Sequence, residues 1–336
     1  MKIALDAMGG DFGPRVNVEG ALLAAREHKL SVVLVGDQKK IQKELAKTRF
    51  SSQSIELVHA SETIEMHERA TESLRSKKES SMRVALELLK NNEVDAVVSS
   101  GHTGAFMASA LLVLKRLPGI ERPAIAGCIP TLKGSCVMLD LGANVECRAS
   151  HLVQFSVMGA LYSKIVEKKE NPVVGLLSNG EEESKGTDVL REAHRLLKTT
   201  NLNYMGFIES KDMLKGKVDV VVCDGFIGNI FLKTAEGLVS TIFSMMRQEF
   251  QKRFFTKLAA GLFYFIFKDT LYSFGRRLDY AEYGSAPLLG LNGVVQVCHG
   301  RSSSRAIKNA LWTAHKSVES HFLERLKEEL ESIHST

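Results

Sequence analysis

The stretch KIALDAMGGDFGP, residues 2–14, predicts how this chain folds. Its first part, residues 2–5, reads as a short buried β-strand, and the glycine-rich turn DAMGGDFGP follows directly. An amphipathic stretch of helical length comes next, at 16–28. Strand, glycine turn and helix in this order form the repeating unit of α/β sheets, in which ligands bind where the strands end. The stretch therefore predicts an α/β fold and a site at a strand end.

The same alternation continues along the chain. Short apolar runs separate stretches of helical length, as in a mainly parallel sheet with helices on both faces. Strands are expected at 2–5, 31–35, 54–58, 94–99, 124–129, 136–139, 173–177 and 218–223. Helices are expected at 16–28, 39–47, 82–90, 105–117, 151–168, 188–198, 227–251 and, as one last helix, about 303–331. Residues 1–336 then form a three-layer α/β/α domain, either single or with two intimate lobes. The polar residues 68–80 read as a long loop before a helix capped by Ser80 or Ser81.

Six glycine-rich turns are candidate binding loops because a helix that follows a strand presents free N–H groups to anions. They are DAMGGDFGP (6–14), SSGHTGA (99–105), LDLGAN (139–144), LLSNGEEESKG (176–186), DGFIGN (224–229) and APLLGLNG (286–293). GxxG pairs alone are a weak signal, and their position after strands is what favours phosphate binding. The candidate ligands in or beside these turns are Asp6, Gly9, Gly10, Gly101, Thr103, Gly104, Asn144, Gly180, Gly225, Gly228 and Lys233.

Several polar residues beside these turns have two interpretations each. His102 either helps to bind an anion or caps its turn. Lys233, one helical turn after Asn229, is either a ligand or a solvated surface charge. The acidic run 181–183 beside Lys185 would repel a phosphate unless its carboxylates turn away or order the lysine. The aspartates after strands are either acid/base groups or helix N-caps: Asp6, Asp11, Asp140 and Asp224.

Several classes of function lack their signatures. The sequence has no GxxxxGK[ST] loop, no GxGxxG after the first strand, no HExxH and no GxSxG. Five cysteines without CxxC spacing indicate reduced thiols in the cytosol rather than disulfides or a zinc site. We therefore expect no metal and no cofactor. The absence of a nucleotide signature beside so many phosphate-compatible turns suggests inorganic phosphate or a small phosphate ester.

One segment carries the entire net charge of +5. Residues 247–277 hold seven lysines and arginines against two acids, and the rest of the chain is neutral. This local excess does not favour binding of nucleic acid over the whole surface. The longest apolar run, residues 258–267, is too short to span a bilayer as a helix. Residues 240–277 are expected to form a protruding, basic, amphipathic helical segment, folded as a helical hairpin.

The turns, together with RSKKESSMRVAL (75–86), RPAIAG (122–127), DGFIGNIFLK (224–233) and YGSAPLLGLNG (283–293), resemble the bacterial phosphate acyltransferases. The resemblance covers residues 1 to about 320. It departs from the family pattern at Ser285, at Arg301 and at residues 178–180, near the expected site. The resemblance implies a fold like that of isocitrate and isopropylmalate dehydrogenases and phosphotransacetylases, and a homodimer. It also implies acyl transfer from acyl-carrier protein to inorganic phosphate in phospholipid synthesis, by an enzyme peripheral to the cytoplasmic membrane.

The residues are compatible with this chemistry, since phosphate near neutral pH is already nucleophilic and chiefly needs positioning. Our hypothesis is that Lys185 and the 101–104 turn bind phosphate, that Asn229 or a nearby N–H polarises the thioester carbonyl, and that His102 orders the phosphate proton. Three other functions stay open at this point. They are an acetyl- or butyryltransferase that uses coenzyme A, a metal-dependent dehydrogenase on the same fold, and a non-catalytic membrane-bound adaptor for carrier protein.

The basic segment has three possible partners: a dimer partner, the membrane surface, or acidic carrier protein. The resemblance favours lipid. The candidate contact residues are Lys257, Leu258, Leu262, Phe263, Phe265 and Lys268.

Overall fold

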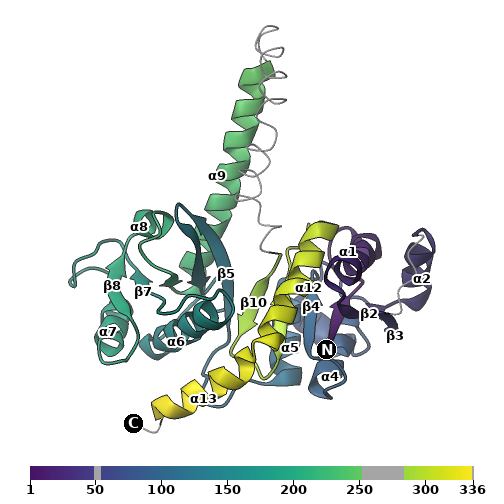
Figure 1. The fold of residues 1–336 in the computed structure, drawn as a ribbon, viewed down its shortest axis with the longest axis horizontal. Coiled ribbons are helices and arrows are strands. Elements are labelled where there is room, and N and C mark those ends of the chain that lie inside the picture. Colours follow the sequence, from purple (N-terminus) through teal and green to yellow (C-terminus); the bar gives the residue numbers. More distant parts are fainter. Residues whose placement is uncertain (49–53, 252–283, 335–336) are drawn as a thin grey trace.

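An 11-stranded sheet runs through the computed structural model, which describes residues 1–48, 54–251 and 284–334 (Figure 1). Its strands lie in the order β3-β2-β1-β4-β11-β10-β5-β6-β9-β7-β8. Their bounds are β1 Lys2–Asp6, β2 Ser31–Gly36, β3 Ile55–His59, β4 Ala96–Ser99, β5 Ala124–Thr131, β6 Gly134–Leu139, β7 Val174–Leu177, β8 Tyr204–Ile208, β9 Val220–Val222, β10 Ala286–Leu289 and β11 Val294–Val297. Seven of the ten strand pairings are parallel, so the expected mainly parallel sheet is confirmed.

The sheet reverses direction near its middle. Strand β11 pairs antiparallel with β10, β10 with β5, and β5 with β6. Five parallel strands (β3, β2, β1, β4 and β11) lie on one side of this reversal, and four (β6, β9, β7 and β8) lie on the other. Each side therefore has its own set of strand ends, and two loop clusters form rather than one.

Helices cover both faces of the sheet because successive strand residues point to opposite sides. In β4, Val97 joins the core beneath α4 and α5, whereas Ala96 and Val98 join the core beneath α1 and α12. In the other half, α6, α7 and α13 cover the face of Val220 and Val222. The helices are α1 Gly13–His28, α2 Gln38–Ala46, α3 Ala70–Ser76, α4 Ser81–Lys90, α5 Thr103–Leu114, α6 Ala149–Ile165, α7 Asp188–Leu197, α8 Ser210–Leu214, α9 Gly225–Gln251, α12 Ser304–Glu319 and α13 Phe322–His334.

Three sequence expectations about these elements were wrong or incomplete. The expected loop at 68–80 contains α3. The expected single last helix breaks at His321, whose φ of 53° lies in the left-handed region, and Phe322 then turns inward against Tyr162. Strands β8, β10 and β11 were missed because they are short and carry a glycine, a proline or a glutamine. Residues 49–53, 252–283 and 335–336 lie outside the described part.

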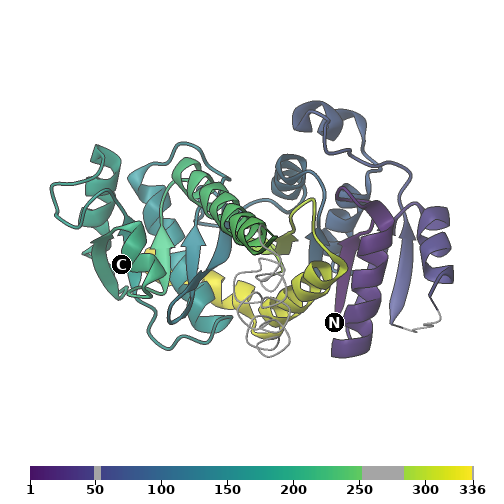
Figure 2. The ribbon, with the colours of Figure 1, turned by 90° about the horizontal axis from the view of Figure 1, so that it is seen from above.

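Helix α9 is the most distinctive element of the molecule. It stands out from the body near the middle of the sheet (Figure 1) and extends across that region when seen from above (Figure 2). Its first turn follows β9 directly, and its later residues are exposed. Helix α9 includes residues 240–251 of the predicted basic segment. Whether the chain is best divided into one domain or two lobes stays a prediction.

Candidate functional site

A buried carboxylate organises the strand ends of the first half. Asp6, at the end of β1, is 1% exposed and accepts hydrogen bonds from Ser81 Oγ at 2.6 Å and Ser99 Oγ at 2.7 Å. It also accepts the Met8 N–H at 3.2 Å. Burial raises the pKa of Asp6, while these donors act in the opposite direction. Asp6 thus joins the β1–α1 loop, the start of α4 and the end of β4. We call residues 6–13, 81 and 99–104 the first strand-end cluster.

The glycines of the first strand-end cluster allow its loops to approach one another closely. A Cβ atom on Gly9 would lie 2.6 Å from the backbone nitrogen of Gly101. A Cβ on Gly10, whose φ is +85°, would lie 2.9 Å from the carbonyl oxygen of Gly300. Gly9, Gly10 and Gly101 therefore shape the cluster by close packing, and any ligand contact they make is through the backbone.

Asn17 of α1, which the sequence reasoning missed, completes this packing. Its Nδ2 donates to the carbonyl oxygens of Ala7 at 3.1 Å and Gly9 at 2.8 Å. Its Oδ1 accepts the Ser100 hydroxyl at 3.2 Å. All these groups are buried, so the turn is held rigidly before any ligand binds. Ser81, Ser99 and Asn17 lay within or beside the quoted motifs, but nothing in their spacing indicated that they would meet.

The N-terminus of α5 is the open part of the first strand-end cluster. His102 occupies the N-cap position, and its Nδ1 accepts the Ala105 N–H at 3.2 Å. Because Nδ1 is an acceptor, the ring proton lies on Nε2. Thr103 and Gly104 are exposed, and within the described residues their backbone N–H groups have no hydrogen-bond partner. Free N–H groups at a helix N-terminus attract anions.

A second buried carboxylate organises the other half. Asp140, 0% exposed, directly follows β6 and accepts the N–H groups of Ile125 and Ala143, both at 3.0 Å, and of Asn144 at 2.7 Å. Burial is the main cause that raises the pKa of Asp140. The Asn144 amide donates to Asp140 at 2.8 Å and to Pro123 O at 2.7 Å, so it holds the loop in place. We call residues 140–144 and 224–229 the second strand-end cluster.

The start of α9 packs against this loop without intervening side chains. A Cβ on Gly225 would lie 2.7 Å from the carbonyl oxygen of Asn144. A Cβ on Gly228 would overlap the carbonyl oxygen of Asp140. Asp224 caps the helix through the Ile227 N–H at 2.8 Å. Unlike α5, helix α9 therefore has most of its N-terminal groups bonded within the protein.

Asn229 and Lys233 follow on α9 with different environments. The exposed Asn229 side chain lies beside Gly142 and makes no hydrogen bond with the described residues. It is therefore free to donate to a ligand. Lys233 forms an ion pair with Glu236 of the next turn at 2.8 Å, and its side chain is 52% exposed. This environment matches the surface-charge interpretation.

Lys185 lies on the loop that links β7 to α7, and its side chain is exposed. Its Cγ would lie 2.9 Å from a Cβ on Gly180, so the lysine stem passes directly over this glycine. Of the acidic run, Glu183 turns away from the lysine and pairs with Lys198. The acids are thus arranged so that they do not all face Lys185.

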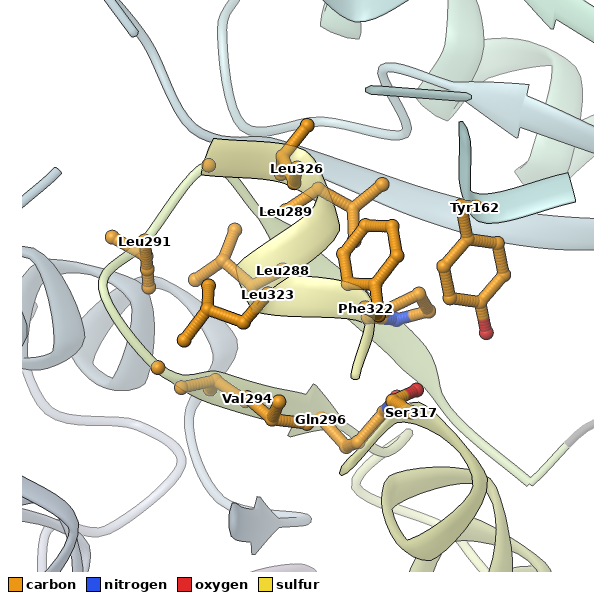
Figure 3. A pocket seen from close by; sticks show the side chains of 14 residues that line it. Tyr162, Leu288, Leu289, Leu291, Val294, Gln296, Ser317, Phe322, Leu323 and Leu326 are labelled. Carbon is orange, nitrogen blue, oxygen red and sulfur yellow. The ribbon is translucent and has the colours of Figure 1, made fainter. Parts of the chain in front are cut away.

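The sixth glycine turn has a different role from the one expected. Residues 290–293 join the antiparallel strands β10 and β11, not a strand to a helix. Beside this hairpin is a cavity lined by Tyr162, Gln296, Ser317, Phe322 and several leucines (Figure 3). Its free space is about 10 Å³, room for about one water molecule. This cavity is too small for a substrate and shares no residue with the strand-end clusters.

The described cysteines and acids give no sign of thiol or metal chemistry. All five cysteines are unpaired, and burial raises the pKa of Cys147 and Cys298 to about 12. A protonated thiol is a poor nucleophile. Within the described residues, no group of three or more His, Cys, Asp or Glu side chains is arranged to hold a metal ion.

The exposed face of α9 is apolar. Leu238, Ile242, Met245 and Met246 are 46–60% exposed and share one helix face through their i, i+4, i+7 and i+8 spacing. By length and composition, residues Gly225–Glu249 could cross a membrane, although their first turn is packed into the second strand-end cluster. The candidate contacts Lys257, Leu258, Leu262, Phe263, Phe265 and Lys268 lie outside the described residues.

Comparison with known proteins decides the family. The family described as "Fatty acid synthesis protein" matches residues 1–325. A protein of Geotalea daltonii named phosphate acyltransferase is 50% identical over 332 residues, which are 98% of this chain and 95% of that protein. A protein of Geobacter sulfurreducens with the same name is 48% identical over 332 residues, 99% of this chain and 95% of its own length. The chain belongs to the phosphate acyltransferase family. The resemblance inferred from the motifs is confirmed, and the chain is an acyltransferase.

Solved structures confirm the fold of this chain. A phosphotransacetylase from Streptococcus pyogenes superposes with a TM-score of 0.64 at 19% identity, covering 95% of this chain and 94% of that one. A 4-hydroxythreonine-4-phosphate dehydrogenase from Klebsiella pneumoniae gives 0.52 at 12% identity, covering 95% and 97%. The expected three-layer architecture, shared by phosphotransacylases and dehydrogenases, is therefore present.

Proposed function

We propose that this chain moves a fatty acyl group from acyl-carrier protein to inorganic phosphate, and that the acyl phosphate product serves glycerophospholipid synthesis. The family description, which names fatty acid synthesis, and the motif resemblance support this choice of donor. Coenzyme A thioesters are the second candidate donor, because the solved structures that share the fold include phosphotransacetylases.

The observation that carries the proposal is the open N-terminus of α5. Thr103 and Gly104 present two N–H groups without a hydrogen-bond partner in the described part of the chain, in a loop that Asp6 and Asn17 hold rigid. This combination suits a small anion, since the groups are positioned before binding and the helix dipole favours negative charge. At the start of α9, in contrast, the first N–H group already donates to the protein, from Gly225 to the Asn144 carbonyl oxygen at 2.7 Å, and the capping side chain is the acidic Asp224. In this proposal phosphate binds at residues 101–104. Lys185 is proposed as its counter-charge; its loop follows β7, which five strands separate from β4, so this role requires both halves of the sheet to bring their loops to one substrate.

The reaction needs few groups beyond these. A phosphate oxygen bonds to the thioester carbonyl carbon and the C–S bond breaks. The carrier thiolate takes the proton that the hydrogen phosphate gives up and leaves as the free thiol. Asn229, whose amide has no partner among the described residues, donates to the oxyanion that develops on the carbonyl. His102 carries its proton on Nε2 and so orders a phosphate oxygen as a donor. The proposal requires that the two strand-end clusters face the same substrates.

The test is an enzyme assay that identifies the acyl donor and the acyl acceptor. The purified protein is incubated with acyl-carrier protein thioester and phosphate, and acyl phosphate is measured as its hydroxamate. Acyl-CoA replaces the carrier thioester in one control, and NAD(P) with a hydroxy acid substrate tests the dehydrogenase alternative. Acyl phosphate formed from the carrier thioester, at a higher kcat/KM than from acyl-CoA, supports the proposal. Efficient turnover of acyl-CoA alone would replace carrier protein as the donor, and carrier binding without turnover would favour the adaptor alternative.

We further propose a cytoplasmic homodimer that associates peripherally with the membrane. The apolar face formed by Leu238, Ile242, Met245 and Met246 is large for a solvated helix and favours a partner. The cations of residues 247–277 favour anionic lipid or acidic carrier protein beside it. Liposome flotation with Leu262→Glu and Phe263→Glu tests lipid insertion, and undiminished flotation would exclude it. Sedimentation of Ile242→Glu tests the dimer: a dimer of unchanged stability would exclude this face as its interface.

A further inference from the structure

The loop that carries Lys185 is closed on itself. Asn179 Oδ1 accepts the Gly186 N–H at 3.0 Å, which joins the two ends of the loop. Arg191 of α7 donates to the Gly186 carbonyl oxygen at 2.6 Å. The backbone of residues 179–186 is therefore tied to α7 at its C-terminal end, whereas Lys185 itself forms no ion pair with the described residues.

The acidic run ties the middle of this loop to neighbouring elements. Glu183 forms a hydrogen-bonded ion pair with Lys198, which directly follows α7, and lies 3.6 Å from His194 Nε2. The Lys198 hydrogen bond is the main cause that lowers the pKa of Glu183. Glu181 points elsewhere, 3.8 Å from Lys217. Glu183 is thus the acid of this run that joins the loop to the α7 region.

His194 packs beside Glu183 without a hydrogen bond to it, since the buried His194 Nε2 has no hydrogen-bond partner among the described residues. Its side chain is 10% exposed, and its ring stacks on Phe207 with centroids 4.6 Å apart. Its Nδ1 lies 2.7 Å from the Tyr204 hydroxyl. The 3.6 Å between His194 Nε2 and the Glu183 carboxylate is longer than a hydrogen bond, so His194 supports Glu183 by packing alone. Burial raises the pKa of Tyr204 far above its ordinary value, so the hydroxyl keeps its proton.

We propose that Glu183, held by its ion pair with Lys198, is a positioning residue that sets the place of Lys185 for phosphate binding. Glu183 and Lys185 are two residues apart in one closed loop, so movement of the first displaces the second. Gly180 contributes because a Cβ atom there would lie 2.8 Å from Glu182 Oε2 and 2.9 Å from Lys185 Cγ, so both side chains would have to shift. This inference rests on the proposed role of Lys185 in binding phosphate. It also gives the acidic run a function beside an anion site.

The experiment measures steady-state kinetics of Glu183→Gln with phosphate and acyl donor varied separately. An exposed ion pair contributes modestly, so we expect the KM for phosphate to rise about three- to tenfold. The KM for the acyl donor and the kcat at saturating phosphate should stay within about twofold. Glu183→Asp should recover part of the phosphate affinity. The matched control is Glu192→Gln, which removes the same charge from α7 but breaks only the pair with Arg195.

Lys185→Ala separates this inference from the proposed function. If Lys185→Ala raises the KM for phosphate and Glu183→Gln adds nothing further in that background, Glu183 acts through the lysine, as proposed. If Lys185→Ala raises the KM for phosphate but Glu183→Gln leaves this KM unchanged, the positioning role of Glu183 is wrong and the proposed function stands. If Lys185→Ala has normal phosphate kinetics, both are wrong. A Glu183→Gln protein with lower thermal stability and lower kcat but unchanged KM would have lost a structural contact only, and this too contradicts the proposal.

Discussion

Gly228 lies directly against the carbonyl oxygen of Asp140, so closely that a Cβ atom on the glycine would overlap it. Through this contact the first turn of α9 docks on the loop after β6. The same loop receives Gly225, for which a Cβ would lie 2.9 Å from Asp140 Oδ2. The two glycines therefore fix where α9 begins, and with it the place of Asn229 one residue later.

Gly228→Ala should destabilise the fold by about 3 kcal/mol or more, because the helix start must move away from a buried loop. Differential scanning calorimetry would show a much lower Tm. Gly237→Ala is the matched control, since it lies on the same helix with nothing within 4 Å of its Cβ position. This control should stabilise α9 by about 0.5–1 kcal/mol through helix propensity. Equal Tm values for the two variants would contradict the close packing.

Thr103→Pro should weaken phosphate binding without unfolding the helix. Proline is well tolerated at the first helical position, and it removes a single N–H group. His102, before it, has a ψ of 105° and so already lies outside the α region that a following proline disfavours. Loss of one hydrogen bond to a charged ligand predicts a rise of about tenfold in the KM for phosphate. The control Thr103→Ala keeps the N–H group and should leave the KM for phosphate unchanged. If both variants had similar KM values for phosphate, this N–H group would not belong to the site.

Asn229→Ala should lower kcat by about 100-fold if its amide stabilises the oxyanion. The KM for phosphate should change little, because the interaction forms in the transition state. The Tm should also stay the same, since the side chain makes no hydrogen bond with the described residues. Thr241→Ala, at another exposed position of α9, serves as the control. A kcat equal to that of the control would exclude the role.

The ionisation of Glu68 makes the free energy of unfolding depend on pH. Its hydrogen bond with Lys77, followed by that with Ser73, lowers its pKa from 4.5 to about 2. A carboxyl group whose pKa is lower in the folded than in the unfolded protein stabilises the fold fully at pH values above the unfolded pKa. This stabilisation is lost as the pH falls through the folded pKa. Urea unfolding should therefore show a loss of stability between pH 4.5 and about 2. Glu68→Gln should reduce this slope, whereas the exposed Glu146→Gln should not.

Most elements were predictable because their signals are local. The runs around Val33 and Val97 are apolar in nearly every position, as strands buried on both faces must be. Strand β11 was not predictable in this way, because Gln296 interrupts its pattern. The structure buries this glutamine completely, and its Oε1 accepts the Ser285 hydroxyl at 2.9 Å. Because Ser285 lies eleven residues away across a hairpin, its hydrogen bond to Gln296 leaves no periodic pattern in the sequence that would indicate a buried strand.

The site was predictable in a similar, limited sense. The position of Asp6 after a strand indicated either a cap or an acid/base group, and only its two serine partners, from α4 and β4, show that it organises loops. His102 likewise proved to cap α5 through Nδ1. The direction of Glu183, away from Lys185 and toward Lys198, depends on α7 and could not be read from the acidic run itself.

The sequence by itself determined the family, the alternation of strands and helices, and the glycine turns at the strand ends. These features depend on residues close together in the chain, whose propensities and spacing are visible without the fold. The tertiary structure alone decided that the sheet reverses between β11 and β6, and that the turns gather in two clusters around Asp6 and Asp140. The physical reason is that buried carboxylates must find donors, and here the fold supplies many of them from distant parts of the chain.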